Sequence, residues 1–368
     1  MRSGSDGREA GPDAVTEVIL RWSSGLGGSS LSRPDSHRPS LSISLPEPIA
    51  VLDDLDAALT TALLAGGLTP RTWCDDVRDE LAVPPPSRCA TPSEALIGAR
   101  TVLWRLPKAV SAVDEYAELI ARHASAEVLV VAGGRDKHLS RSMNDALARH
   151  FDSVSATLGH RKARALVAAR PRPGRARWPA SAHLDALNVT VAAHGATFST
   201  NRLDRGTALL ASCFERLPDA GSAIDLGCGS GILTTLLARR GVNIHAVDVA
   251  WSATDATRLT AAANGVEAKV LRRAGLAGWR QPVDLIVTNP PFHVRSAKDT
   301  SPTRALFDQA SDVLVEGGEL WCVYNAHLPY LHWLRDTIGP TEIVARDRAY
   351  VVTRSVRRHE AGQLDRRV

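Results

Sequence analysis

The sequence predicts an α/β protein in which two doubly wound sheets follow one another along the chain. A length of 368 residues exceeds what one ordinary core needs and suits two domains of roughly 150 residues each. Short apolar runs alternate with helical stretches, as in mainly parallel sheets whose strands are joined by helices. A segment rich in Pro and Arg at residues 170–178 interrupts this alternation. We therefore place the boundary between the two domains there.

Composition divides the chain into further segments. Residues 1–45 are rich in Ser, Gly, Pro and Arg, and we predict a disordered extension. The remaining segments are a first domain over residues 46–170, a linker over 171–180, a second domain over 181–358 and a tail over 359–368.

The composition also excludes several classes of protein. No apolar run approaches the roughly 20 residues of a membrane span, and no apolar segment typical of a secretory signal follows the start. The five cysteines are scattered without a C-x-x-C pair, so neither a metal site nor a disulfide framework is predicted. We expect a monomeric, cytoplasmic protein that uses no metal and contacts no membrane.

The net charge of +4 and the pI of about 8.9 permit a polyanionic partner without requiring one. Basic residues crowd the region before and within the linker and recur near the end. They form either a solvated linker and tail or a patch that contacts RNA. These residues are Arg161, Lys162, Arg164, Arg170, Arg172, Arg175, Arg177, Arg354, Arg357 and Arg358.

Apolar periodicity assigns the elements of the first domain. We expect helices over residues 50–64, 110–123 and 140–150, and strands over 101–104 and 127–132.

The second domain is more regular. Its predicted strands cover residues 222–226, 243–247, 267–271, 283–288 and 319–324, followed by a terminal antiparallel hairpin over 342–346 and 349–354. Its predicted helices cover residues 204–217, 231–240, 252–263, 303–315 and 328–338, with Ser252 as an N-cap.

A glycine loop follows the first predicted strand of the second domain. Gly227, Gly229 and Gly231 stand between a strand and a helix, where glycine lets a ligand approach the backbone and the helix presents N–H groups. Asp225 lies within the strand and Asp248 ends the next one, where its carboxylate would accept hydrogen bonds from both hydroxyls of a ribose. Asp225 would orient the loop or meet an ammonium group. This pattern suits S-adenosylmethionine better than a dinucleotide.

The motif Asn289-Pro290-Pro291-Phe292-His293 follows the fourth predicted strand of this domain. With it the sequence resembles the class I methyltransferases that modify exocyclic amines, in which the turn implies a target nitrogen beside the cofactor's methyl group. The Asn289 oxygen and the Pro290 carbonyl would each accept an N–H bond and align the nitrogen's lone pair. Pro291 would stiffen the turn and Phe292 would stack on a flipped base. His293 would lie beside the substrate as a base or, alternatively, make a structural hydrogen bond.

A longer set of motifs narrows the resemblance to the bacterial ribosomal RNA guanine-N2 methyltransferases. In the second domain these are Phe198-Ser199, Leu203-Asp204-x-Gly206, the Asp225 loop, the Asn289 motif, Gly317-Gly318-Glu319-Leu320 and Asn325-Ala326-His327-Leu328-Pro329-Tyr330. In the first domain they are Leu103-Trp104-Arg105-Leu106-Pro107-Lys108, Gly133-Gly134-Arg135-Asp136-Lys137-His138 and Gly159-His160-Arg161-Lys162-Ala163-Arg164.

The resemblance implies two tandem class I methyltransferase-like sheets of the Rossmann-like type, the N-terminal one degenerate. It further implies that the first domain helps hold RNA and the second binds S-adenosylmethionine and methylates ribosomal RNA or a ribosomal subunit. One departure is Arg272-Arg273-Ala274-Gly275, where the family usually offers Asn or Asp near the adenine amino group. Trp251 either covers the adenine or packs in the core.

Two other functions stay open on the sequence. The same motif would serve an enzyme whose acceptor is adenine, DNA or a protein glutamine amide, since each presents a planar NH2. A non-catalytic RNA-binding assembly factor is the alternative from a different class. The domains also echo each other, with Arg105-Leu106-Pro107-Lys108 standing where the second domain has Asn289-Pro290-Pro291-Phe292.

Overall fold

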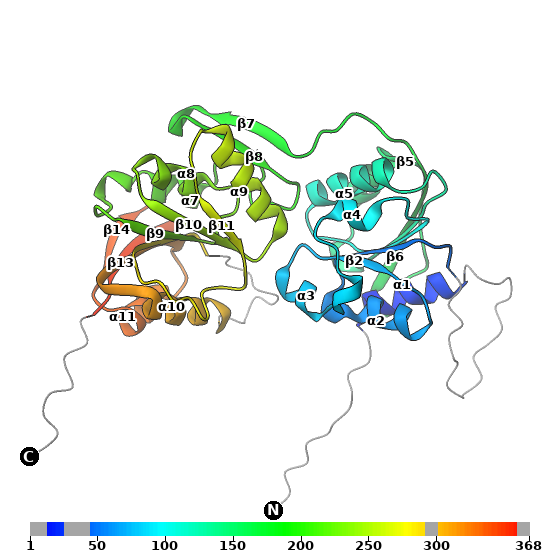
Figure 1. Cartoon of the computed structure of the whole chain (residues 1–368), viewed down its shortest axis with the longest axis horizontal. Coiled ribbons are helices and arrows are strands. Elements are labelled where there is room, and N and C mark those ends of the chain that lie inside the picture. The colour runs from blue at the N-terminus through cyan, green and yellow to red at the C-terminus, as the bar shows by residue number, and fades with distance from the viewer. Residues whose placement is uncertain (1–12, 26–44, 291–300, 359–368) are drawn as a thin grey trace, which may run out of the picture. The chain divides into compact units, whose positions relative to one another are not determined.

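The computed structural model describes residues 13–25, 45–290 and 301–358. The chain divides into two compact units, Met1–Arg177 and Trp178–Val368. Each unit is a sheet covered by helices (Figure 1), which confirms the predicted pair of α/β sheets. No helix in the described residues has the length and apolar character needed to cross a membrane.

The described strands of the first unit form a six-stranded sheet in the order β2-β1-β3-β4-β6-β5. Strands β2, β1, β3 and β4 are parallel, while β6 and β5 pair in the antiparallel sense. Their bounds are β1 Ile49–Leu52, β2 Arg71–Trp73, β3 Thr101–Arg105, β4 Leu129–Arg135, β5 Phe151–Ala156 and β6 Ala163–Pro171.

Helices cover both faces of this sheet (Figure 1). One face packs against α1 and α2, whose side chains share a core with β1, β3, β4 and β6. The helices are α1 Ala14–Gly25, α2 Ala58–Ala65, α3 Val77–Ala82, α4 Pro92–Leu96, α5 Val110–His123 and α6 Arg141–Ala148.

The prediction of one disordered segment over residues 1–45 was wrong for α1. This helix buries Val15, Val18 and Ile19 in the core of the first unit. Gly133 on β4 makes room for it, because a Cβ atom there would lie 2.6 Å from Ile19 Cγ1. Residues 1–12 and 26–44 lie outside the described part of the chain.

The helix predicted over residues 50–64 was wrong in its first half and correct from Ala58 onward. The apolar run that opens it is the buried strand β1, and α2 begins only at Ala58. Between them the buried Asp54 carboxylate accepts hydrogen bonds from Leu59 N at 2.9 Å and Thr60 N at 2.7 Å. These bonds satisfy N–H groups at the start of α2 and fix the break between strand and helix.

The described strands of the second unit form a seven-stranded sheet in the order β11-β10-β9-β12-β13-β15-β14. The first five are parallel, and β13, β15 and β14 pair in the antiparallel sense, which confirms the terminal hairpin. Their bounds are β9 Ser222–Leu226, β10 Asn243–Asp248, β11 Lys269–Arg272, β12 Val283–Thr288, β13 Leu314–Asn325, β14 Thr341–Arg346 and β15 Tyr350–Val356.

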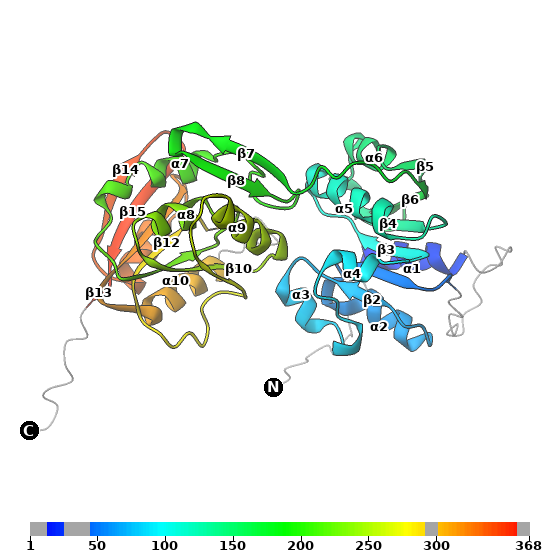
Figure 2. The same cartoon turned by 45° about the horizontal axis from the view of Figure 1, so that its top comes forward.

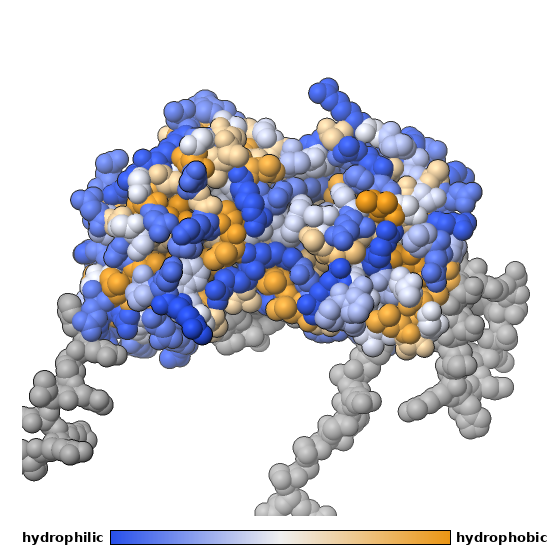
Figure 3. Space-filling view, in the orientation of Figure 1, coloured by the Kyte–Doolittle hydropathy of each residue, from blue (hydrophilic) through white to orange (hydrophobic). Residues whose placement is uncertain are grey.

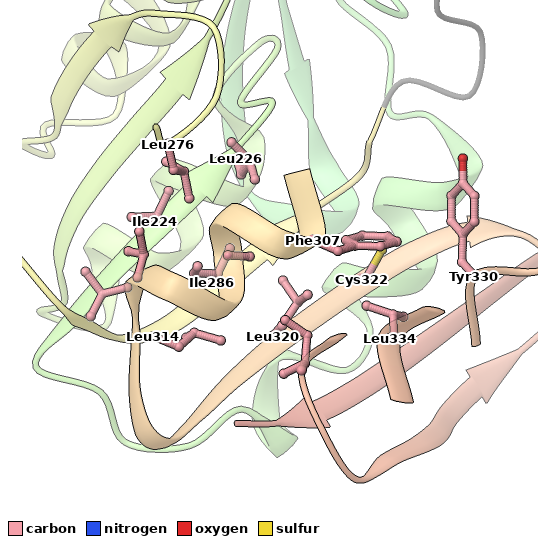
Figure 4. Close-up of a cluster of buried hydrophobic side chains, with 14 of the residues drawn as sticks. Ile224, Leu226, Leu276, Ile286, Phe307, Leu314, Leu320, Cys322, Tyr330 and Leu334 are labelled. Atoms are coloured by element: carbon pink, nitrogen blue, oxygen red, sulfur yellow. The ribbon is translucent and has the colours of Figure 1, made fainter. Parts of the chain in front are cut away.

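Helices cover both faces of the second sheet. One apolar cluster joins the sheet to α10 and α11 through residues such as Ile286, Phe307 and Leu334 (Figure 4). The opposite cluster joins it to α7 and α8. The helices are α7 Arg205–Ala211, α8 Ile232–Arg239, α9 Trp251–Ala263, α10 Ser301–Val313 and α11 Tyr330–Thr337.

A separate hairpin of β7 (Ala180–Leu184) and β8 (Val189–Ala193) lies along α8 and α9 (Figure 2). Thr260 of α9 bonds to the backbone of Ala192, and Asn264, the C-cap of this helix, bonds to the backbone of Thr190. The predicted N-cap of α9 was wrong: the helix begins at Trp251, and Ala250 occupies the cap position. Ser252 is therefore already inside the first turn.

The register of the two sheets places their strands in correspondence. Asp53 N donates to Trp73 O at 2.9 Å, as Gly227 N donates to Val247 O at 2.8 Å. Leu52 pairs with Trp104 in the first unit, as Leu226 pairs with Thr288 in the second. Hence Asp53 stands where the second unit has Gly227, Cys74 where it has Asp248, and Arg105 where it has Asn289.

Candidate functional site

A cavity of about 450 Å³ opens at the carboxyl ends of β9, β10 and β12 in the second unit. In open parallel sheets, ligands bind at this edge. Its wall includes residues from the glycine loop, from the end of β10, from the turn after β12, from the segment before α7 and from the first turn of α7. These are, among others, Gly227, Gly229, Asp248, Asn289, Pro290, Phe198, Arg202, Asp204 and Thr207.

The glycine loop contains backbone conformations that residues other than glycine rarely adopt. Gly227, Gly229 and Gly231 have φ of 80°, 56° and 79°. At Gly231 a Cβ atom would lie 2.9 Å from Thr257 Cα. Thr257 Oγ1 in turn donates to Gly229 O at 3.1 Å. The loop is thus held against α9, with Gly227 and Gly229 on the cavity wall.

Asp248 ends β10 and fixes the other side of the loop. Its Oδ2 accepts a hydrogen bond from Gly229 N at 3.1 Å, and its Oδ1 accepts one from Ala250 N at 3.0 Å. An ionised carboxylate has about four acceptor positions. The side chain can therefore accept bonds from the hydroxyls of a ligand while it holds the loop.

Asp225 lies behind the loop. The residue is 1% exposed, and its Oδ2 accepts a hydrogen bond from Thr234 Oγ1 at 2.6 Å. Within the described residues Oδ1 has no hydrogen-bond partner. Burial, with a smaller contribution from the charge of Asp248, raises the pKa of Asp225 to about 7. Neither Asp225 nor Gly231 lies on the cavity wall.

Asn289 follows β12 and stands at the cavity wall with its amide held on one side. Nδ2 donates to Asp204 Oδ2 at 2.9 Å and to Thr207 Oγ1 at 3.1 Å. Oδ1 is buried and makes no hydrogen bond to any described residue. Orphaned buried acceptors are rare in folded proteins and call for an explanation. A donor from a ligand would supply the missing partner.

The structure brings together part of the predicted site. Gly227, Gly229, Asp248, Asn289 and Pro290 share one cavity. The predicted residues Pro291, Phe292 and His293 lie outside the described part of the chain.

Sequence reasoning assigned no role to the segment before α7, which also lines the cavity. Phe198 is 62% exposed there, and the backbones of Ser199 and Thr200 have φ of 56° and 53°. Asp204 is the N-cap of α7. The Asp-x-Gly pattern was visible in the sequence, but its contact with Asn289 spans 85 positions and no local signal reveals it.

The segment after β11 contributes Arg273 and Gly275 to the cavity wall. Arg273 N donates to Asp248 O at 2.8 Å, and its guanidinium lies over the Trp279 ring. Trp251 instead packs against the ring of His194, with 5.0 Å between centroids, and is not on the cavity wall. Among the residues that the structure covers, no group of His, Cys, Asp and Glu side chains is arranged to hold a metal ion.

Comparison with known proteins matches both units to protein families. Residues 188–354 match the methyltransferase small domain, and residues 40–173 match the RLMG N-terminal domain. Ribosomal RNA large subunit methyltransferase G of Streptomyces avermitilis is 31% identical over 335 residues, which cover 84% of this chain and 87% of that protein. The same enzyme of Pseudomonas aeruginosa is 34% identical and covers 69% of this chain and 70% of its own length.

Two further relatives belong to the small-subunit type. Ribosomal RNA small subunit methyltransferase C of Alcanivorax borkumensis is 36% identical, and the match covers 47% of this chain and 54% of that protein. Among solved structures, the T. thermophilus 16S rRNA N2 methyltransferase RsmC, in complex with AdoMet and guanosine, has a TM-score of 0.73 at 20% identity. It covers 96% of this chain and 94% of its own, which shows a shared fold.

Proposed function

Because this chain belongs to the ribosomal RNA large subunit methyltransferase G family, we propose that it transfers a methyl group from S-adenosylmethionine to the exocyclic N2 of a guanosine in ribosomal RNA. The observation that carries this proposal is the buried Oδ1 of Asn289, an acceptor without a described partner at the wall of a cavity. A planar amine offers the two N–H donors that such a site needs.

The residues of the cavity fit the cofactor. Gly227 and Gly229 let a ligand approach the backbone, and the carboxylate of Asp248 stands where it can accept bonds from ribose hydroxyls. The volume of about 450 Å³ lies within the range of small-molecule sites. When bound, S-adenosylmethionine supplies an electrophilic methyl group on a sulfonium.

The chain's part in the reaction is to position the amine. The nitrogen lone pair of guanine N2 is delocalised into the ring, so the free amine is a poor nucleophile. If Asn289 Oδ1 and the Pro290 carbonyl each accept one of its hydrogens, the nitrogen is held in place and its lone pair is directed toward the methyl group. The methylated nitrogen then loses a proton to solvent.

The first unit supplies cations for the RNA. Much of the basic run in the sequence is engaged in ion pairs: Arg161 with Glu17, Arg164 with Asp136, and Arg177 with Asp114. A different group, which we call the cationic cluster, consists of Lys108, Arg135 and Lys137 around His138. No described carboxylate lies within ion-pair distance of these three residues.

The pKa of the His138 ring is lowered first by desolvation and then by the charges of Lys108, Lys137 and Arg135. These three exposed residues therefore lie close to His138. Unpaired cations of this kind are suited to phosphate. On the surface shown in Figure 3, apolar residues lie in small groups among hydrophilic ones, which also suits a charged partner.

We further propose that the protein acts as a monomer in the cytoplasm, on free ribosomal RNA or on a ribosomal subunit. One chain supplies every residue used above. None of its five cysteines, all within the described residues, forms a disulfide, as expected in a reducing compartment.

Asn289→Ala tests this function. We expect methyl transfer from labelled S-adenosylmethionine to ribosomal RNA of cells lacking the protein to fall by about 100-fold, because one transition-state hydrogen bond is removed. Cofactor binding, measured by calorimetry, should change little. Mapping the labelled nucleoside as N2-methylguanosine would support the acceptor, whereas a labelled adenosine or protein amide would overturn it. Undiminished transfer by the variant would contradict the role of Asn289.

A further inference from the structure

The side-chain amide of Asn289 is held by both of its N–H groups. One Nδ2 hydrogen goes to Asp204 Oδ2 at 2.9 Å and the other to Thr207 Oγ1 at 3.1 Å. With both hydrogens engaged, the nitrogen end of the amide faces α7. The oxygen end therefore points away from α7 and has no described partner.

We infer that Asp204 and Thr207 are positioning residues for methyl transfer: they hold the Asn289 amide so that its oxygen, and not its nitrogen, is presented to the amine of the substrate. This inference rests on the function proposed above. An amide turned by 180° fills the same space but opposes an N–H donor to the donors of the amine. The orientation of the amide therefore decides whether the turn after β12 is a productive acceptor.

Asp204 is itself rigidly held. As the N-cap of α7 it accepts hydrogen bonds from Gly206 N at 2.9 Å on Oδ1 and from Thr207 N at 2.8 Å on Oδ2. A Cβ atom at Gly206 would lie 3.2 Å from the Tyr350 ring and 3.4 Å from Asn289 Nδ2. Glycine thus lets the start of α7 lie close to Asn289, and the cap fixes the direction of the carboxylate before any substrate arrives.

The first unit contains the same arrangement with a different outcome. Asp13 precedes α1, accepts a hydrogen bond from Val15 N at 2.9 Å, and pairs with Arg105 at 3.0 Å. Arg105 occupies the position of Asn289. In each unit an aspartate at the start of a helix therefore holds a side chain at the carboxyl end of a strand, which is Arg105 at the end of β3 and Asn289 just after β12. Arginine has no acceptor to offer, so only the second copy presents an oxygen.

Two substitutions test the inference without removing Asn289. Asp204→Ser keeps a good helix cap but leaves one oxygen, closer to the main chain, for the cap and Asn289 together. Thr207→Val keeps the shape of the side chain and removes its hydroxyl. We expect each to lower kcat for transfer to ribosomal RNA by about 10- to 100-fold, because a misoriented acceptor costs rates of this order. The Kd for S-adenosylmethionine should stay within about threefold.

Thr207→Ser, which restores the hydroxyl, is expected to recover most of the rate lost in Thr207→Val. Thr91→Ala is the control for a lost helix cap: Thr91 caps α4 in the first unit, so this variant should lose thermal stability without a fall in kcat. If Asn289→Ala abolishes transfer while Asp204→Ser and Thr207→Val retain full kcat, the positioning role is overturned and the proposed function stands. If Asn289→Ala itself retains transfer, the proposed function fails first.

Discussion

The buried carboxyl group of Asp225 makes the free energy of unfolding depend on pH. Its pKa is raised to about 7 from an ordinary value of 3.8. Between these two values the unfolded chain has lost the proton while the folded chain still holds it. The folded state binds more protons there, so the free energy of unfolding falls as pH rises from about 4 to 7. The effect is about 1.4 kcal/mol for each unit of pKa difference.

Asp225→Asn removes this titration. We expect the variant to gain thermal stability relative to the wild type on going from pH 5 to pH 8, because the wild type alone must ionise a buried group. Differential scanning calorimetry at both pH values measures the difference. Asp219→Asn, at a fully exposed position, serves as the matched control and should show no such trend. If the unfolding temperatures of Asp225→Asn and the wild type differ by the same amount at pH 5 and pH 8, the prediction is contradicted.

Local patterns made part of the site predictable from the sequence. The glycine loop directly follows a strand, as Asn289 does, and Asp248 ends one, so spacing along the chain fixes their position. The partners of Asn289 could not be predicted, because Asp204 and Thr207 lie more than 80 positions away and meet it only when α7 packs beside β13 and β15. Nor does spacing show that Asp225 and Gly231 stand behind the cavity wall.

Two elements, α1 and β1, differ from what composition and apolar periodicity predict. α1 lies in a segment rich in Ser and Gly, and the burial of Val15, Val18 and Ile19 in the core of the first unit stabilises it. The sequence predicts a helix where β1 lies, because the apolar run of this strand leads into that of α2. Besides the hydrogen bonds of Asp54, the break between them includes Asp53, Asp56 and Ala57 with φ of 56°, 53° and 55°, a conformation that few residues other than glycine adopt.

Ile19→Ala tests the place of α1 in the first unit. Ile19 is fully buried, and its loss should leave a cavity that costs about 2–4 kcal/mol of unfolding free energy. Urea unfolding measures the change, and calorimetry should find cofactor binding by the second unit intact. Leu64→Ala on α2 is the control: its side chain is 39% exposed, so we expect a cost below about 1 kcal/mol. A cost for Ile19→Ala no greater than for Leu64→Ala would show that α1 contributes little.

The sheets of the two units have corresponding strands but different residues at the carboxyl ends of those strands. The second unit has glycines, Asp248 and Asn289. The first has Asp53, Cys74 and Arg105 at the corresponding positions, and Lys108 of the cationic cluster follows three residues after Arg105. Neither the loop nor the acceptor for an amine survives there, whereas positive charge is added. This division of residues supports catalysis by one unit and RNA binding by the other.

Reversing the charge of the cationic cluster tests that division. In the triple variant Lys108→Glu, Arg135→Glu and Lys137→Glu, we expect the Kd for ribosomal RNA to rise by at least about 10-fold. The slope of log K against log salt should lose about 2 to 3 units, since each phosphate contact contributes about 0.7 to 0.9. Filter binding over a range of salt concentrations measures both, and calorimetry should show the affinity for S-adenosylmethionine unchanged.

A second triple variant separates local contacts from net charge. Lys269→Glu, Arg280→Glu and Arg304→Glu change the total charge equally at exposed positions of the second unit. If the cations act only through long-range attraction, both triple variants should weaken RNA binding to the same degree. Direct phosphate contacts at the cationic cluster predict a larger loss of affinity and of salt dependence when Lys108, Arg135 and Lys137 are reversed. Equal losses would assign the effect to net charge and remove the cluster from the RNA-binding surface.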